Sequence, residues 1–330
     1  MGESGISGCP MKVLITGARG LLGSAVAREV IGRGHACVVV QRNPCGVQGV
    51  TEFLDDLTDP QYSRQWIEGV DAVIHLAAKV SVTGTESDFQ RINVDATSNL
   101  IQIAQAEGVG RFVFASSPSV AHTGSPLIGV GAEPADPQHA RGYYSKTKAL
   151  AEQIVLDANG PTFATVALRP HLVWGPGDTQ LIGRIVQRAR SNRLFLIDGG
   201  NSLIDTCYVS NAASAFVQAV EHAHRASGKV LMVTNGEPRT VKETLQRICL
   251  AAGVPLPTRS VPHSVALLAG SVLERVWGNR VSDPPLTSFL VEQLSTAHWF
   301  AIAETKELLD WEPTVSIDEG FRLLRESYSH

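Results

Sequence analysis

Three glycines near the start of the chain constrain its fold more than any other feature. Lys12 to Thr16 is a short apolar run typical of a buried strand, and Leu21 to Gly32 carries apolar residues at helical spacing. The loop between them reads Gly17-Ala-Arg-Gly20-Leu-Leu-Gly23. Glycines there let the backbone approach a pyrophosphate, which would lie at the positive N-terminus of the helix. We therefore predict a dinucleotide-binding turn that includes Arg19 and Leu22, with a purely structural glycine turn as the alternative.

The alternation of strand and helix continues through the first half of the chain. Further strands are predicted at 36–40, 72–76, 111–115 and 165–168, and further helices at 91–106 and 144–156. This order predicts an α/β fold with a Rossmann-like doubly wound parallel sheet. After about residue 175 the alternation becomes irregular. We expect a flexible extension (1–10), an NAD(P)-binding Rossmann domain (11–175) and a mainly substrate-binding region (176–330) with some segments returning to the Rossmann core.

Composition narrows the functional classes. Of the 330 residues 44% are hydrophobic and 18% are charged, and the net charge of -4 argues against nucleic acid as a partner. Five scattered cysteines without a Cys-x-x-Cys pair indicate neither a disulfide framework nor a metal site, and favour the cytoplasm. The most apolar later stretch, Val261 to Val276, is too short and too polar to span a bilayer. Its contact with a membrane surface, a partner or a lipid-like substrate stays open.

The end of the second predicted strand discriminates between the two nicotinamide cofactors. Proteins that bind NAD usually carry an acidic residue there, which accepts hydrogen bonds from the ribose 2′-hydroxyl. This chain has Gln41-Arg42 instead. Arg42, together with Arg19, is suited to a 2′-phosphate because an arginine donates charge-assisted hydrogen bonds in a fork. The pattern favours NADP(H) over NAD(H), while a solvated surface arginine is the alternative.

A tyrosine and a lysine mark the predicted chemistry. Tyr144 and Lys148 are four residues apart, which on a helix places them on one face. A lysine ammonium lowers the pKa of a nearby phenol, which could then exchange a proton with a carbinol or carbonyl oxygen. Ser117 follows the strand at 111–115 and is expected at the sheet edge where ligands bind. Asn93 is a candidate to order water or backbone there, with a capping role as the alternative.

In order along the chain, these motifs resemble the extended short-chain dehydrogenases. The resemblance implies that Ser117 binds the substrate oxygen, that Tyr144 is the acid/base, and that Lys148 holds both the tyrosine and the nicotinamide ribose. The remaining positions implied for the cofactor are Asp56 and Leu57 beside the adenine, Ala77 beside the ribose and Pro170 beside the nicotinamide. The matching residues, which extend to Lys306-Glu-Leu-Leu-Asp-Trp-Glu-Pro313, are Gly17-x-x-Gly20-x-x-Gly23, Asp56-Leu57, His75-Leu-Ala-Ala78, Asn93, Ser116-Ser117, Tyr144-x-x-x-Lys148, Arg169-Pro170 and Gly175-Pro-Gly-Asp178.

Longer segments narrow the resemblance. Residues 167–178, 201–205 and 208–209 resemble the 3β-hydroxysteroid dehydrogenase branch, whereas 117–122 and 292–299 resemble the bacterial 2-alkyl-3-oxoalkanoate reductases of long-chain olefin biosynthesis. The resemblance implies NADPH-dependent reduction of the β-keto group of a two-tailed fatty acid. A 3β-hydroxysteroid or sterol-4-carboxylate dehydrogenase is the alternative, followed by a nucleotide-sugar epimerase and an NADP-binding redox sensor.

The resemblance also implies a homodimer in which the helices that begin at Arg91 and Tyr144 pack across a twofold axis. These helices carry apolar residues beyond one core stripe, including Ile101, Ile103, Ala151 and Ile154. Association with other enzymes of the same lipid pathway stays open.

The residue before Asp205 bears on the substrate. Nucleotide-sugar enzymes of this fold commonly carry an arginine there to grip a diphosphate, and this chain has Ile204. The many apolar residues between 255 and 300 also favour an apolar substrate, because they could form a channel for acyl chains or a sterol. Core packing or a subunit surface is the alternative. His122, His171 and His298 are candidates to orient a carboxylate, although a lone histidine is more often structural. No metal-ligand spacing is present in the sequence.

Overall fold

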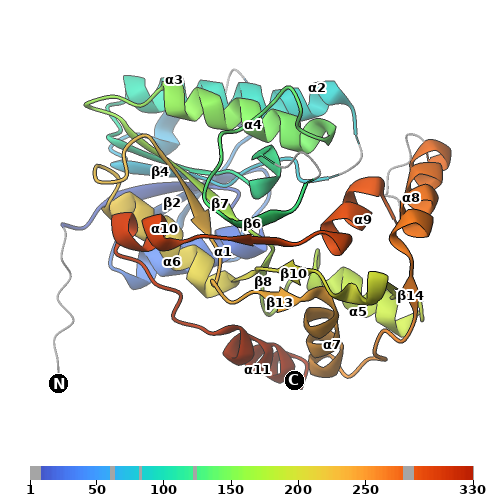
Figure 1. Cartoon of the computed structure of the whole chain (residues 1–330). Helices are drawn as coiled ribbons and strands as arrows, with labels where there is room; N and C mark the ends of the chain where they lie inside the picture. Colours follow the sequence, from blue (N-terminus) through green and yellow to red (C-terminus); the bar gives the residue numbers. More distant parts are fainter. Residues whose placement is uncertain (1–8, 60–63, 82–83, 122–124, 278–285, 330) are drawn as a thin grey trace.

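The structure is a computed structural model that describes residues 9–59, 64–81, 84–121, 125–277 and 286–329 (Figure 1). Its centre is a sheet of seven parallel strands in the order β12-β7-β5-β4-β1-β2-β3. The inner strands are apolar on both faces because helices cover both, and this confirms the predicted Rossmann-like fold. The strands are β1 (Lys12–Thr16), β2 (Ala36–Gln41), β3 (Thr51–Leu54), β4 (Ala72–His75), β5 (Arg111–Ala115), β7 (Ala164–Pro170) and β12 (Lys229–Val233).

Helices form one layer on each side of this sheet. On one face α1 (Leu21–Gly32) packs along α6 (Val209–Glu221), and α10 (Ala303–Leu309) lies beside α6 (Figure 1). On the other face lie α3 (Ala96–Ala106) and α4 (Gly142–Asp157). The chain moves outward from β1 through β2 to β3 and then returns to β4 on the other side of β1. A ligand crevice is expected at the carboxyl ends of β1 and β4, where this order reverses.

The helix predicted over 91–106 begins earlier, at Glu86, and contains a π-helical turn. A short helix, α2 (Glu86–Phe89), leads into a π-helical turn over Gln90–Asp95, and only then does α3 begin. Such a turn adds one residue to the helical repeat and is frequent at functional sites. It contains Asn93, which is 2% exposed. The periodicity of apolar residues did not reveal this interruption.

The apolar residues singled out for subunit contacts belong to the protomer's own core. Ile101, Ile103 and Ala151 are buried between the α3–α4 layer and the sheet, and Ile154 is half-buried against them. The expectation that they form apolar surface beyond one core stripe was therefore wrong, because both helices bury a wide face. The homodimer itself stays a prediction.

A second lobe stands at the carboxyl edge of the sheet. A four-stranded sheet in the order β13-β10-β15-β6 and two small strand pairs, β11–β8 and β14–β9, tie the lobe together. β6 comes from the first half of the chain, whereas β12 and α6 of the Rossmann unit come from the second. The elements of this lobe are β6 (Leu127–Val130), β8 (Val173–Trp174), α5 (Ile182–Arg190), β9 (Leu196–Ile197), β10 (Leu203–Ile204), β11 (Cys207–Tyr208), β13 (Arg239–Thr240), α7 (Val241–Ala251), β14 (Ser260–Val261), α8 (His263–Trp277), α9 (Ser288–Ser295), β15 (His298–Phe300) and α11 (Ile317–Ser327).

Candidate active site

The three glycines of the first loop have different surroundings. Gly17 has a φ of +76°, and a Cβ there would lie 2.8 Å from the backbone nitrogen of Ala77. A Cβ on Gly23 would lie 2.2 Å from the carbonyl oxygen of Gly17, so the helix could not pack this closely. Gly20 caps α1 without a side-chain hydrogen bond, and a Cβ on it would meet only that same oxygen, at 3.6 Å. The N-terminus of α1 is thus open toward the crevice, as a pyrophosphate requires.

The end of β2 lies against this loop. The Gln41 side chain is buried, accepts a hydrogen bond from the backbone N–H of Arg19 (2.9 Å) and donates one to Glu52 (2.8 Å). The side chains of Arg19 and Arg42 are both exposed. Two arginines therefore belong to the loop and the strand end where the second hydroxyl of an adenosine ribose is expected.

The remaining predicted cofactor residues follow neighbouring strands at the same sheet edge. Asp56 and Leu57 come after β3, and Ala77 comes after β4, where its N–H donates to the Thr16 hydroxyl at 3.0 Å. Partial burial works to raise the pKa of Asp56, but hydrogen bonds from Thr58 and the charges of Arg42 and Arg91 outweigh it and hold that pKa below its usual value. The Asp56 carboxyl is therefore an acceptor at neutral pH.

A buried polar chain that the sequence analysis missed joins β1, β4 and α3. The Thr16 hydroxyl lies 2.7 Å from His75 Nδ1, and His75 Nε2 lies 2.9 Å from the Thr97 hydroxyl. Because the Thr97 hydroxyl donates to the carbonyl of Asn93, it accepts from His75, whose Nε2 therefore carries the proton. Burial and the nearby Lys148 lower the pKa of His75 to about 3, so it stays neutral.

Asn93 connects the same region to α4. Its Oδ1 accepts from the backbone N–H of Lys79 (2.7 Å), and its Nδ2 donates to the Thr147 hydroxyl (3.1 Å). Thr147 in turn donates to the carbonyl of Tyr143. The side chain therefore holds the segment after β4 against the turn of α4 that carries the predicted tyrosine.

Ser117, Tyr144 and Lys148 meet at the carboxyl end of β5. Ser117 and Tyr144 line one cavity, whereas the Lys148 Nζ donates to the carbonyl of Ala115 and lies 3.8 Å from the centroid of the Phe114 ring. Burial lowers the pKa of Lys148 to about 7, although the charge of Glu152 works to raise it. Glu152 itself forms a buried pair with Arg169.

The tyrosine pKa moves in the direction opposite to the one expected from Lys148. Burial raises the pKa of Tyr144 above its usual value, and a hydrogen bond with Ser117 lowers it by less. The expectation of a net lowering was based on the ammonium alone and omitted desolvation. In this structure Tyr144 is therefore a protonated phenol at neutral pH, ready to donate a proton.

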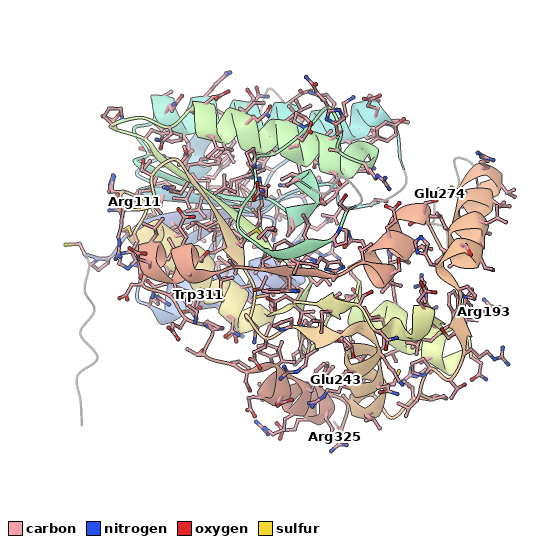
Figure 2. The ribbon with its side chains drawn as sticks, in the orientation of Figure 1. Arg111, Arg193, Glu243, Glu274, Trp311 and Arg325 are labelled. Carbon is pink, nitrogen blue, oxygen red and sulfur yellow. The ribbon has the colours of Figure 1, made fainter. Side chains whose placement is uncertain are left out.

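The cavity beyond these residues has a volume of about 290 Å³ and is mostly apolar. Of the described residues that line it, none is a lysine, arginine, aspartate or glutamate. Ile204 lies in its wall, as does Pro170 at the end of β7. Figure 2 shows the labelled Arg193, Glu274 and Arg325, all exposed, on the outer side of the second lobe. None of these three charged residues lines the cavity.

Only part of the predicted apolar channel is correct. Leu290 of α9 lines the cavity, but the α8 residues Val265 (54% exposed), Leu268 (68%) and Val276 (69%) face solvent. The side chain of Phe289 lies outside the described residues. None of the described helices is both long and apolar enough to cross a bilayer.

The walls come instead from α5 and α7, which the sequence analysis did not single out. The apolar residues of both helices recur at helical spacing. This pattern predicts an amphipathic helix, but it does not predict which part of the protein the apolar face covers. The lining residues of this wall are Leu181, Ile185, Val241, Thr244, Leu245 and Ile248.

Two of the three predicted histidines lie together in the cavity wall. The rings of His171 and His298 meet edge to face with centroids 4.8 Å apart. His171 Nδ1 lies 2.6 Å from the carbonyl oxygen of Asp205, and the Asp205 N–H donates to the carbonyl of His298. Burial raises the pKa of Asp205 to about 6, and hydrogen bonds, including one from Thr234, work to lower it. The third histidine, His122, lies outside the described residues.

Comparison with known proteins gives concordant similarities. Residues 14–262 match the 3-beta hydroxysteroid dehydrogenase/isomerase family. The chain is 39% identical over 327 residues to a 2-alkyl-3-oxoalkanoate reductase of Stenotrophomonas maltophilia (strain K279a), covering 96% of this chain and 99% of that protein. It is 30% identical over 335 residues to the Homo sapiens sterol-4-alpha-carboxylate 3-dehydrogenase, decarboxylating. This match covers 96% of this chain and 88% of that protein. The UDP-glucuronic acid 4-epimerase from Bacillus cereus in complex with NAD is 18% identical with a TM-score of 0.74 over 96% of this chain and 100% of that one, a likeness of fold alone.

Proposed function

The chain belongs to the 3-beta hydroxysteroid dehydrogenase/isomerase family and is an NAD(P)-dependent oxidoreductase acting on CH–OH groups, and we propose that its substrate is a long-chain 2-alkyl-3-oxoalkanoic acid. In this proposal the β-keto group is reduced to the 3-hydroxy acid. The 39% identity to a reductase of that name over almost the whole of both chains supports the choice. The observation that carries it is the cavity itself, which joins Ser117 and Tyr144 to apolar walls free of charged residues among the described lining.

The roles proposed for the polar residues follow from their positions. The Ser117 hydroxyl donates to the keto oxygen, and the phenol of Tyr144 passes its proton to that oxygen as the carbonyl carbon is reduced. A reduced nicotinamide cofactor, with its pyrophosphate held at the glycine loop and its nicotinamide beside Pro170, would supply the hydride. The raised pKa of Tyr144 keeps its phenol protonated before the reaction, and the ammonium of Lys148 would stabilise the phenolate that remains after the proton is transferred. Asn93 positions this arrangement through the segment after β4 and through α4.

We assign the cofactor to residues 11–175 and the substrate mainly to the second lobe, with NADP(H) preferred over NAD(H). The exposed Arg19 and Arg42 would both reach a 2′-phosphate beside Gln41. The end of β2 carries Gln41 and Arg42 in place of the acidic residue that is usual in proteins that bind NAD, which supports the choice of NADP(H).

A sterol is the second candidate, because one specific observation favours it. The chain is 30% identical to a sterol-4-alpha-carboxylate 3-dehydrogenase over 96% of its length, and an apolar cavity suits a rigid ring system as well as acyl tails. The two substrates differ in flexibility. Each added carbon of a flexible tail should bury more apolar surface in the cavity, whereas a rigid sterol buries its whole ring system at once.

The experiment measures kcat/KM for 2-alkyl-3-hydroxy acids of increasing tail length in the oxidative direction, beside a 3β-hydroxysteroid and a UDP-sugar. Each methylene that enters the cavity contributes roughly 0.8 kcal/mol, so we expect kcat/KM to rise about threefold or more per carbon until the walls are reached. The UDP-sugar should be inert because no arginine lies at position 204. Turnover confined to the steroid would replace the proposed substrate, and a flat tail-length profile would remove its physical basis.

A further inference from the structure

One carboxylate holds both ends of the short loop that carries Arg42. Glu52 lies on β3, which pairs with β2. Its Oε1 accepts a hydrogen bond from the side-chain amide of Gln41 (2.8 Å) and another from the backbone N–H of Cys45 (2.8 Å). Gln41 is the last residue of β2, so the residues between these two anchors, 42–44, are held at both ends by a single oxygen atom.

The same chain of hydrogen bonds reaches the glycine loop. The buried Gln41 side chain, whose amide nitrogen donates to Glu52, accepts with its Oε1 from the backbone N–H of Arg19 at 2.9 Å. An amide can make this connection because it both donates and accepts, whereas an ionised carboxylate at the same position could only accept. Glu52 is therefore linked, directly or through Gln41, to the backbone of both segments that carry an arginine at the expected ribose.

A loop that is held in advance loses less conformational freedom when it binds a ligand. The Arg42 side chain is exposed, and fixing a long exposed side chain and its backbone on a phosphate costs conformational entropy. Hydrogen bonds, of which the one from the backbone N–H of Cys45 contributes most, hold the pKa of Glu52 below its usual value. The carboxylate is therefore ionised at neutral pH, and the bonds that it accepts are charge-assisted.

We infer that Glu52 is a positioning residue for cofactor selectivity, which holds the loop at 42–44 so that Arg42 is placed for the 2′-phosphate of NADP(H). This inference rests on the proposed preference for NADP(H). Glu52 does not bind the phosphate itself, because a carboxylate only accepts hydrogen bonds and two anions repel each other. Its effect is confined to cofactors with a 2′-phosphate, because NAD(H) lacks the group that Arg42 would pair with.

The charge of Glu52 and its hydrogen bonds have opposite effects on a phosphate, and two substitutions separate them. Glu52→Gln removes the charge but keeps an oxygen that can accept from Gln41 and Cys45, whereas Glu52→Ala removes both. Arg42→Ala, alone and combined with Glu52→Ala, shows whether Glu52 acts through Arg42. Glu107→Ala is the matched control, because this exposed glutamate follows α3 just before β5 and its removal changes the net charge equally.

The experiment measures dissociation constants by titration calorimetry without a substrate. The ligands are NADPH, NADH, and the fragments adenosine 2′,5′-bisphosphate and 5′-AMP, which differ only in the 2′-phosphate. Unmodified protein is expected to bind NADPH at least about tenfold more tightly than NADH. Glu52→Ala should lower this ratio about threefold or more through the Kd of NADPH, and the fragment pair should show the same loss. The Kd of NADH should change less than about twofold, which also shows that the variant is folded.

The other variants decide how Glu52 acts. Glu52→Gln and Glu107→Ala are expected to keep the ratio, and Glu52→Ala should have no further effect on it once Arg42 is replaced. An unchanged ratio in Glu52→Ala, or an equal weakening of NADH, would overturn the inference. A ratio that rises in both Glu52 variants would overturn it as well, since Glu52 would then act through its charge. Equal binding of NADPH and NADH by the unmodified protein would instead refute the proposed cofactor preference, and the inference with it.

Discussion

The buried lysine of the site makes a testable contribution to stability. Burial lowers the pKa of Lys148 from 10.5 to about 7, and the side chain is 3% exposed. The unfolded chain therefore holds this proton more tightly than the folded one, which favours unfolding. This penalty is fully present below about pH 7 and disappears as the pH rises through 10.5. Substitution by a neutral side chain of similar length should relieve it.

The magnitude follows from the shift. One pKa unit corresponds to about 1.4 kcal/mol, so the penalty is up to about 4 kcal/mol at pH 7 and about 1 kcal/mol near pH 9.5. Lys148→Met also removes the donor to the Ala115 carbonyl, which costs about 1–2 kcal/mol at either pH. We expect the variant to be about 2 kcal/mol more stable than the unmodified chain at pH 7 and about equal to it near pH 9.5. Its turnover should be lost.

Urea unfolding of both proteins at the two pH values, without cofactor, measures these free energies. Lys146→Met on the same helix is the matched control, because Lys146 is exposed and its ion pair with Glu86 lies at the surface. That substitution should change the free energy of unfolding by less than about 1 kcal/mol. A Lys148→Met variant that is destabilised by the same amount at both pH values would refute the reasoning, since it would show that the lysine is not desolvated in the folded state.

Three further predictions concern catalysis, cofactor and assembly. Tyr144→Phe removes the proton donor but keeps the ring, so turnover should fall at least about a hundredfold while NADPH still quenches protein fluorescence on binding; near-normal turnover would assign the proton to another group. We expect the unmodified protein to prefer NADPH over NADH by at least about tenfold in kcat/KM. Arg42→Ala should reduce this preference because one charge-assisted pair to the 2′-phosphate is lost. An unchanged ratio would leave Arg19 as the discriminating residue. Light scattering at micromolar concentration should give the mass of a dimer with a twofold axis, and a monomer there would contradict the family-based expectation.

Local sequence patterns were sufficient to predict those features of the site whose residues lie close together in the chain. The glycine loop could be predicted because its three glycines lie within seven residues, between a predicted strand and a predicted helix. The close approach of Gly17 to the backbone of Ala77 depends on the fold. Tyr144 and Lys148 could be paired because helical spacing alone places them on one face. The strands that alternate with helices before residue 175 were found in the same way, although β3, with its mostly exposed residues, was missed.

Long-range packing decided the rest. His171 and His298 are far apart in the chain and meet only because β10 pairs with β15 next to Asp205. The walls of the cavity come from α5 and α7, whose apolar spacing predicts a buried face but not what that face covers.

The direction of a pKa shift likewise depends on the fold. The spacing of Tyr144 and Lys148 predicts a favourable charge interaction, whereas the structure shows that desolvation prevails for both groups. Desolvation is set by every element that covers a side chain, and most of those elements are distant in the sequence. The sequence by itself therefore determined which groups are candidates for the chemistry, and only the tertiary structure decided their protonation and the residues that line the space beside them.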